Sequence, residues 1–177
     1  MIVAGHQSHY LPGMRYFAKM LACDRFILVD HLQFVKKEWQ NRNKIRTNDG
    51  TMWLTVPIIS EGKMQQKISD VEIDNNIDWK RIHWRALEFN YGKAPYFDEY
   101  KQFFQEVYEK KWTKLVDINR AIIKFLVGEL KIDREIVLSS DLGLKEKGTD
   151  LLIEMCKKLN VNTYLSGQAA KSYLELE

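Results

Sequence analysis

Two imidazoles, an amide and a phenol lie close together near the start of this 177-residue chain, at His6, His9, Gln7 and Tyr10. They follow an apolar run over residues 2–4 that predicts a β-strand. Ligands of open α/β sheets bind beyond the carboxyl ends of the strands, and a helix predicted over 14–22 would bring its positive end there. An anionic ligand suits this place, with His6 as general acid or base because an unperturbed imidazole titrates near neutrality. The alternative is a polar loop whose histidines bond neighbouring backbone groups.

A second cluster, over residues 33–46, combines cations with amides and an indole. Its cations Arg42, Lys44 and Arg46 alternate and would share one face of an extended segment. An alternating basic face suits phosphate, and arginine supplies a bidentate fork. Gln40, Asn41 and Trp39 add amide groups and a stacking surface. A solvated loop is the plain alternative. RNA would use similar groups, but the sequence has no aromatic repeat or broad basic surface to favour it.

Two further places contribute candidate ligand-binding residues. Asp30 ends a second buried strand over 26–29, and strand, helix, strand within thirty residues indicates a right-handed parallel crossover. Ser166 and Gly167 end a late strand over 163–165, where a helix predicted over 168–174, with Lys171 near its start, would again present free N–H groups. If the first and last strands share a crevice, His6, Gln7 and Tyr10 should face Ser166 and Gly167, with Asp30 on the same rim.

The remaining pattern predicts the fold class. A third buried strand over 136–138 completes an α/β architecture: a parallel sheet with helices on both faces, of the Rossmann-like kind. Segments 51–59 and 68–73 read as an antiparallel β insertion that extends or flanks the sheet. Helices are predicted over 79–90, 97–108, 115–126 and 150–159, with Asp78 as an N-cap. Asn119 interrupts an apolar stripe, and a buried amide paired with a loop backbone is the favoured interpretation. The length fits a single domain over 1–177.

Composition excludes several classes of protein. No apolar run reaches the ~20 residues of a membrane span, and the start lacks the features of a signal peptide, so we expect a cytoplasmic protein. A net charge of +3 is too small to indicate nucleic acid. Cys23 and Cys156 fall among apolar residues of predicted helices and are expected to be buried, reduced and unpaired. No cofactor or oligomeric state is indicated.

The chain resembles the WbqC-like protein family over almost its whole length and in matching order. The resemblance rests on segments 6–12, 16–17, 30–34, 39–43, 53–57, 94–97 and 164–167, among them His6-Gln7, Trp39-Gln-Asn-Arg-Asn43 and Tyr164-Leu-Ser-Gly167. It implies an association with bacterial surface-polysaccharide genes, without a defined reaction. Where the family more usually reads His-Gln-Pro-Asn-Tyr, this chain has Ser8 and His9. The family also usually continues beyond residue 174, so the resemblance implies a shorter member or a truncated chain.

A second, weaker likeness concerns the nucleotidylyltransferases of the HIGH superfamily. They share a strand, a histidine-containing loop and a helix, followed by a late strand with Ser-Gly before a helix. The likeness implies a HUP-type fold and an anion site whose loops hold nucleotide phosphates. The chain lacks a His-x-Gly-His motif, so the likeness does not imply the same reaction.

Three functions follow from these observations. The first is a transferase that binds a nucleotide, nucleotide sugar or other phosphorylated small molecule, with His6 as acid or base and Arg42, Lys44 and Arg46 adding charge stabilisation. The second is a non-catalytic nucleotide or sugar sensor within a biosynthetic complex. The third is a metal-dependent hydrolase using His6, His9, Asp30 and His31, which no metal-binding spacing supports.

Overall fold

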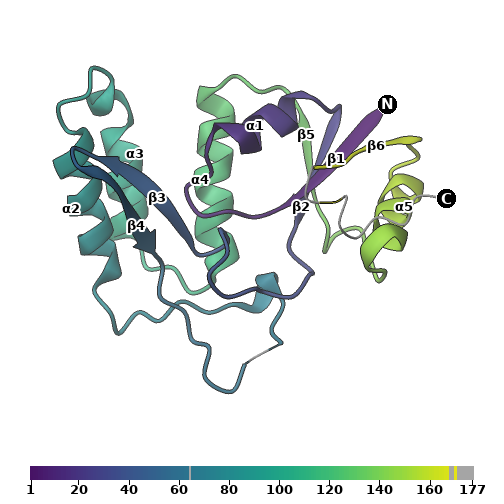
Figure 1. The fold of residues 1–177 in the computed structure, drawn as a ribbon, viewed down its shortest axis with the longest axis horizontal. Coiled ribbons are helices and arrows are strands. Elements are labelled where there is room, and N and C mark those ends of the chain that lie inside the picture. Colours follow the sequence, from purple (N-terminus) through teal and green to yellow (C-terminus); the bar gives the residue numbers. More distant parts are fainter. Residues whose placement is uncertain (64, 168–169, 171–177) are drawn as a thin grey trace. The chain divides into compact units, whose positions relative to one another are not determined.

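The computed structural model describes residues 1–63, 65–167 and 170, which form two compact units (Figure 1). Unit 1 comprises Met1–Ser8, Pro12–Leu32 and Phe125–Glu177, and unit 2 comprises His9–Leu11 and Gln33–Lys124. The helix predicted after Gly167, and with it Lys171, falls largely outside the described residues.

Unit 1 is built on a four-stranded sheet in the order β5-β2-β1-β6. Its strands are β1 (Ile2–Gln7), β2 (Arg25–Val29), β5 (Glu135–Leu138) and β6 (Thr163–Leu165), and all of its pairings are parallel. This confirms the predicted parallel sheet and its four strands. The chain moves outward from β1 to β2 and β5, and then crosses to the other side of β1 to form β6.

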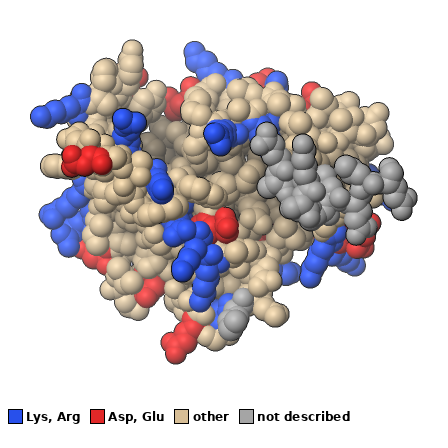
Figure 2. Space-filling view, in the orientation of Figure 1, with Lys and Arg blue, Asp and Glu red and all other residues tan. Residues whose placement is uncertain are grey.

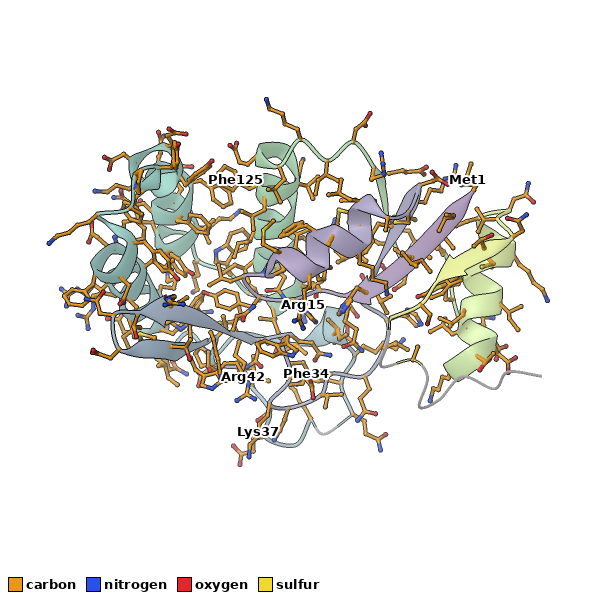
Figure 3. All side chains as sticks on the ribbon, turned by 45° about the horizontal axis from the view of Figure 1, so that its top comes forward. Met1, Arg15, Phe34, Lys37, Arg42 and Phe125 are labelled. Carbon is orange, nitrogen blue, oxygen red and sulfur yellow. The ribbon has the colours of Figure 1, made fainter. Side chains whose placement is uncertain are left out.

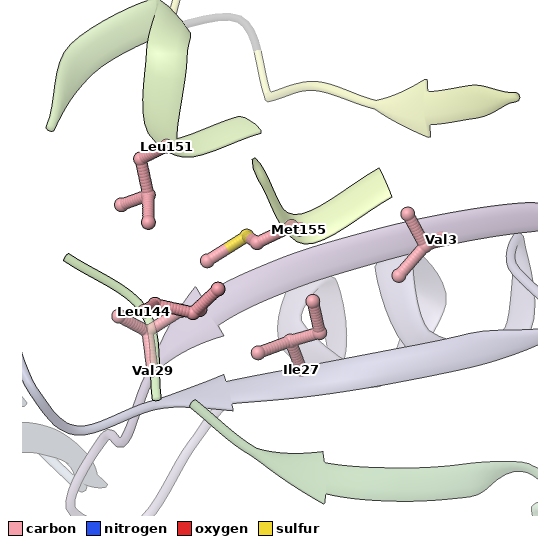
Figure 4. Packing of buried hydrophobic residues seen from close by; sticks show 6 residues of the cluster. All are labelled: Val3, Ile27, Val29, Leu144, Leu151 and Met155. Carbon is pink, nitrogen blue, oxygen red and sulfur yellow. The ribbon is translucent and has the colours of Figure 1, made fainter. Parts of the chain in front are cut away.

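The helices α1 (Met14–Leu21) and α5 (Gly148–Lys158) cover opposite faces of this sheet. Figure 4 shows the strand residues Val3, Ile27 and Val29 packed with Leu151 and Met155 of α5. Successive strand side chains point to opposite faces, so Phe26 points the other way and meets Tyr16 of α1, with ring centroids 5.5 Å apart. Apolar side chains thus hold a helix on each side, as predicted.

The pairing of β1 is asymmetric along its length. Its register with β6 ends at Ala4↔Leu165, whereas its register with β2 continues to Gln7↔Val29. Beyond Ala4, β1 therefore has a strand neighbour on one edge only. This opening lies at the point where strand order reverses, which is where open α/β sheets bind ligands.

Unit 2 contains a β-hairpin and helices. Strands β3 (Arg42–Thr47) and β4 (Gly50–Thr55) form an antiparallel pair joined by a tight turn. Helices α2 (Trp79–Tyr91) and α3 (Phe97–Glu109) follow, and α4 (Leu115–Glu129) begins in unit 2 and ends in unit 1. The buried side chains of Ile45 and Leu54 lie on one face of the hairpin. Arg42, Lys44 and Arg46 share the opposite face, as the alternation predicted.

The predicted strand over 68–73 is wrong, and the β insertion, which was predicted to extend or flank the parallel sheet, does not extend it. Residues Ile68–Asp70 form a 3₁₀ helix, and β4 ends at Thr55 instead of reaching Ile59. Ile68 and Val71 are both fully buried. A three-residue spacing brings side chains to one side of a 3₁₀ turn, which explains why both of these side chains are buried. The hairpin forms a sheet of its own.

Smaller predictions are refined in the same way. Asp78 precedes α2, but its carboxylate pairs with Arg81 and makes no capping bond. Cys23 and Cys156 are both free thiols, as predicted, although Cys23 follows α1 instead of lying within it and Cys156 is only half-buried.

Within the described part of the chain, no helix combines the length and the apolar character of a membrane span. Figure 2 shows lysine and arginine side chains spread over the visible face among acidic ones.

Candidate functional site

A pocket of ≈ 490 Å³ opens in unit 1 beside the part of β1 that β6 does not pair. One side of its lining comes from the end of β1 and the other from β6 and the turn after it, and Leu151, Leu152 and Met155 of α5 supply an apolar wall. The polar and glycine residues of the lining are Gly5, His6, Gln7, Lys19, Gly148, Tyr164, Ser166 and Gly167. Four predicted site residues, His6, Gln7, Ser166 and Gly167, therefore meet at one pocket, at the strand ends where they were expected.

Lys19 is the functional candidate that the sequence did not reveal. It belongs to α1, and its Nζ donates a hydrogen bond to the Gly5 carbonyl oxygen at 2.8 Å. The pairing of β1 with β6 does not include Gly5, and the Gly5 carbonyl oxygen instead accepts the hydrogen bond from the Lys19 ammonium group. Desolvation lowers the pKa of Lys19 below its usual value. The available signal was its position three residues after Tyr16, on the apolar side of the predicted helix.

His6 lies near the end of β1 and is half-buried. Its Nδ1 is 3.2 Å from the Gln7 carbonyl oxygen, and its ring lies 5.1 Å from the Tyr16 ring. Burial lowers the pKa of His6 below 6.5, and the charge of Lys19 lowers it further. A neutral imidazole is therefore the favoured form near neutral pH, and in that form His6 is equipped to accept a proton.

The turn after β6 supplies a buried hydroxyl. Ser166 Oγ is buried and has no hydrogen-bond partner among the described residues. A buried hydroxyl without a partner is costly, typically by about 1–3 kcal/mol, and a ligand in the pocket would relieve that cost. Tyr164 also borders the pocket, and a side chain at Gly5 would come within 3.0 Å of its hydroxyl oxygen. Gly5 thus permits the close approach of β1 and Tyr164.

The electrostatics of this pocket favour an anion. Lys19 contributes a cation, and none of the described lining residues is Asp or Glu. Gly148, the first residue of α5, also lines the pocket, so the positive end of that helix adds to the field. His6, Tyr164 and Ser166 complete the site with neutral polar groups that are able to donate hydrogen bonds.

Asp30 is outside this lining and instead joins the ends of β2 and β5. Its Oδ1 accepts hydrogen bonds from Ser139 Oγ at 2.8 Å and from the Ser140 amide at 2.9 Å, and its Oδ2 accepts one from Ser140 Oγ at 2.9 Å. His31 Nδ1 lies 2.7 Å from Ser139 Oγ. Because the serine proton goes to the carboxylate, Nδ1 of His31 is the donor. The arrangement differs from a catalytic triad, in which the carboxylate would orient the histidine.

Three predicted ligand-binding residues of unit 2 are buried and make hydrogen bonds within the protein. Tyr10 is fully buried, and its hydroxyl is bonded to His83 Nδ1 and to the Tyr108 hydroxyl. Gln40 Oε1 accepts the Val35 amide at 3.0 Å. Asn41 Nδ2 donates to the Val56 carbonyl at 2.9 Å. These groups build the unit 2 scaffold.

The favoured interpretation of Asn119, a buried amide paired with a loop backbone, is confirmed. Its Nδ2 donates a hydrogen bond to the Gln40 carbonyl oxygen at 2.8 Å. The remaining candidates of unit 2 are the half-buried His9 and the three cations of β3. No group of three or more metal-binding side chains is gathered within the described residues. His6, His9, Asp30 and His31 therefore do not form the cluster that a hydrolytic metal site would need.

Fold and pocket define an α/β protein with a ligand-sized pocket at the switch point of a parallel sheet. Comparison with known proteins adds a family: the model of the WbqC-like protein family matches residues 7–177. The chain is also 37% identical over 174 residues to the uncharacterized protein Rv1507c of Mycobacterium tuberculosis, covering 98% of this chain and 75% of that protein. The chain belongs to the WbqC-like family. No solved structure matches it.

Proposed function

We propose that this protein is a transferase of bacterial surface-polysaccharide biosynthesis that binds a nucleotide or nucleotide sugar in the unit 1 pocket. The observation that carries the proposal is that His6, Lys19 and the Ser166 hydroxyl meet around one pocket. Among the described residues, that hydroxyl has no hydrogen-bond partner and the pocket lining contains no carboxylate. Membership of the WbqC-like family supports the biological setting.

The strand order supports a nucleotide as the ligand. Numbered as they occur along the chain, the four parallel strands lie in the order 3-2-1-4. This is the order of the Rossmann class, in which the phosphates of a nucleotide lie at the switch point beside the first strand. We assign unit 1 to this Rossmann-like class, which includes the HUP fold. The pocket lies at this switch point, and the helix terminus at Gly148 beside it supports phosphate binding.

The described residues suggest a division of roles during transfer from a nucleotide sugar. An acceptor hydroxyl attacks the anomeric carbon, and its proton passes to the neutral imidazole of His6. The bond between that carbon and the phosphate oxygen breaks, and the nucleoside diphosphate leaves with the electron pair. Lys19 and Ser166 stabilise the charge that develops on the leaving phosphate.

Binding is tested by calorimetric titration with a panel of nucleotides and nucleotide sugars. Lys19→Met and Ser166→Ala should weaken binding of the ligand found, Lys19→Met by about tenfold or more. Lys157→Met is the matched control, because Lys157 is an exposed lysine of α5 outside the pocket lining. Equal affinities in all four proteins would overturn the proposed site.

Turnover is tested separately with His6→Ala. This variant should retain ligand binding and lose transfer to an acceptor, because it removes the proton acceptor but keeps the cation and the hydroxyl of the pocket. Binding by the wild-type protein without transfer to any polysaccharide acceptor would contradict the transferase assignment. It would instead favour the non-catalytic sensor.

A further inference from the structure

Unit 2 contains a second pocket, of ≈ 340 Å³, beside the base of its hairpin. Three cations line it, Lys36, Lys37 and Arg42, together with the polar side chains of Asn41, Thr55 and Ser60. Figure 3 shows Lys37 and Arg42 with Phe34, a residue of the apolar lining, on this part of the unit. No described lining residue is acidic, and within the described chain the three cations form no ion pair.

Arg42 is held in position before any ligand arrives. Its guanidinium carbon lies 4.1 Å from the centroid of the Trp53 ring, and its Nη2 donates to the Lys37 carbonyl oxygen. Its Nε is buried and has no hydrogen-bond partner among the described residues. An arginine fixed by stacking loses little conformational entropy on binding an anion. The Nε–H group is therefore left unsatisfied by the described residues.

Lys37 has an unusual backbone conformation for its residue type. Its φ is +67°, in the left-handed region that residues other than glycine seldom occupy. The surrounding loop maintains this conformation, because Gln40 Oε1 accepts the Val35 amide and Asn119 binds the Gln40 carbonyl. Such conformations persist where the surrounding structure enforces them, and they are enriched at ligand sites. Buried amides thus hold two lysines beside Arg42.

We infer that this pocket binds a small phosphorylated sugar. Three cations with no carboxylate among the described lining residues favour a ligand with more than one negative charge, which a phosphate monoester carries. The volume lies at the lower end of the ~300–1,000 Å³ typical of ligand pockets, which favours one sugar ring over a dinucleotide. Thr55 and Ser60 offer hydroxyl groups to the sugar, and the half-buried Pro57 offers carbon surface. The inference stands on unit 2 alone and does not depend on the function proposed for unit 1.

The test is an NMR titration of the ¹⁵N-labelled full chain with glucose 1-phosphate, with glucose and inorganic phosphate as separate arms. The amide signals of Thr55 and Ser60 should shift with glucose 1-phosphate, less with inorganic phosphate, and not with glucose. Lys36→Glu and Lys37→Asn should each weaken binding about tenfold or more. Asparagine is chosen at position 37 because it tolerates a positive φ.

Lys93→Glu is the matched control, since Lys93 is an exposed lysine of unit 2 that does not line the pocket. It changes the net charge as Lys36→Glu does and should leave the affinity unaltered. Three results would overturn the inference: no signal shifts with glucose 1-phosphate, equal weakening by Lys93→Glu, or shifts confined to His6, Ser166 and their neighbours.

Discussion

The hydroxyl of Tyr10 lies 2.8 Å from Nδ1 of His83, although 73 positions separate the two residues in the sequence. The same hydroxyl lies 2.5 Å from that of Tyr108, and burial raises the pKa of both tyrosines. His83 is buried as well, and desolvation lowers its pKa to about 4. The three side chains form a neutral hydrogen-bonded core within unit 2, and protonation of His83 would place an uncompensated charge inside it.

This relationship predicts a pH-dependent stability. The folded-state pKa of His83 is about 4, against 6.5 for an unperturbed histidine, so the unfolded chain binds more protons between these values. The contribution of His83 to the free energy of unfolding should therefore fall as the pH decreases from about 6.5, and that contribution should level off below about 4. The gap in pKa corresponds to a loss of roughly 3 kcal/mol. Urea unfolding at a series of pH values measures this loss.

The contribution of His83 is isolated with His83→Gln, which removes the titrating group. The variant is expected to be less stable than the wild type at pH 7, and its stability should vary less between pH 4 and 6.5. The pKa of His6 is also lowered in the folded protein, so the stability of the variant should still depend on pH to some extent. An unaltered slope in His83→Gln would show that His83 is not the source.

A second prediction concerns the coupling of Lys19 and His6. Lys19→Met removes the charge that helps to lower the pKa of His6, so that pKa should rise. It should stay below 6.5, because burial is the larger cause and persists in the variant. An NMR pH titration of the His6 ring protons measures the change, with Lys157→Met as the control. A His6 pKa that is the same in all three proteins would refute the coupling.

Much of unit 1 was predictable because its strands contain short apolar runs, each followed by polar residues. The placement of His6 and Ser166 follows from that pattern alone, since the carboxyl ends of parallel strands share one edge. The pairing of Asn119 was also predictable, because an amide on an apolar stripe needs a partner.

Other features depend on contacts that the sequence does not reveal. Tyr10 occurs in a polar stretch, but it is buried by His83 and Tyr108, which lie far along the chain. The sequence places Lys19 on the apolar side of its helix, but its hydrogen bond to the Gly5 carbonyl depends on the end of the β1–β6 pairing, which the sequence does not reveal. The role of Asp30 likewise depends on two serines more than a hundred residues away.

The third prediction separates a structural role for Asp30 from ligand binding. Asp30→Asn places an NH₂ group where the carboxylate accepts hydrogen bonds from Ser139 and Ser140. The free energy of unfolding should fall by about 1–3 kcal/mol, while the affinity for the unit 1 ligand stays within a factor of about two. Chemical denaturation and calorimetry measure the two quantities. A strong loss of affinity with unchanged stability would instead make Asp30 a ligand-binding residue.

The last prediction concerns the close approach of Gly5 and Tyr164 in the lining of the unit 1 pocket. In Gly5→Ala, the added methyl group would lie 3.0 Å from Tyr164 Oη and 3.4 Å from Val29 Cγ2. Crowding of this kind should lower the free energy of unfolding by about 1–3 kcal/mol and weaken ligand binding, because Tyr164 must shift at the pocket wall. Tyr164→Phe removes the crowded oxygen atom, so it should restore much of this loss when combined with Gly5→Ala. A double-mutant cycle measured by chemical denaturation gives the coupling free energy between the two positions. Additive effects would show that the methyl group is accommodated elsewhere and that the contact between Gly5 and Tyr164 does not shape the pocket.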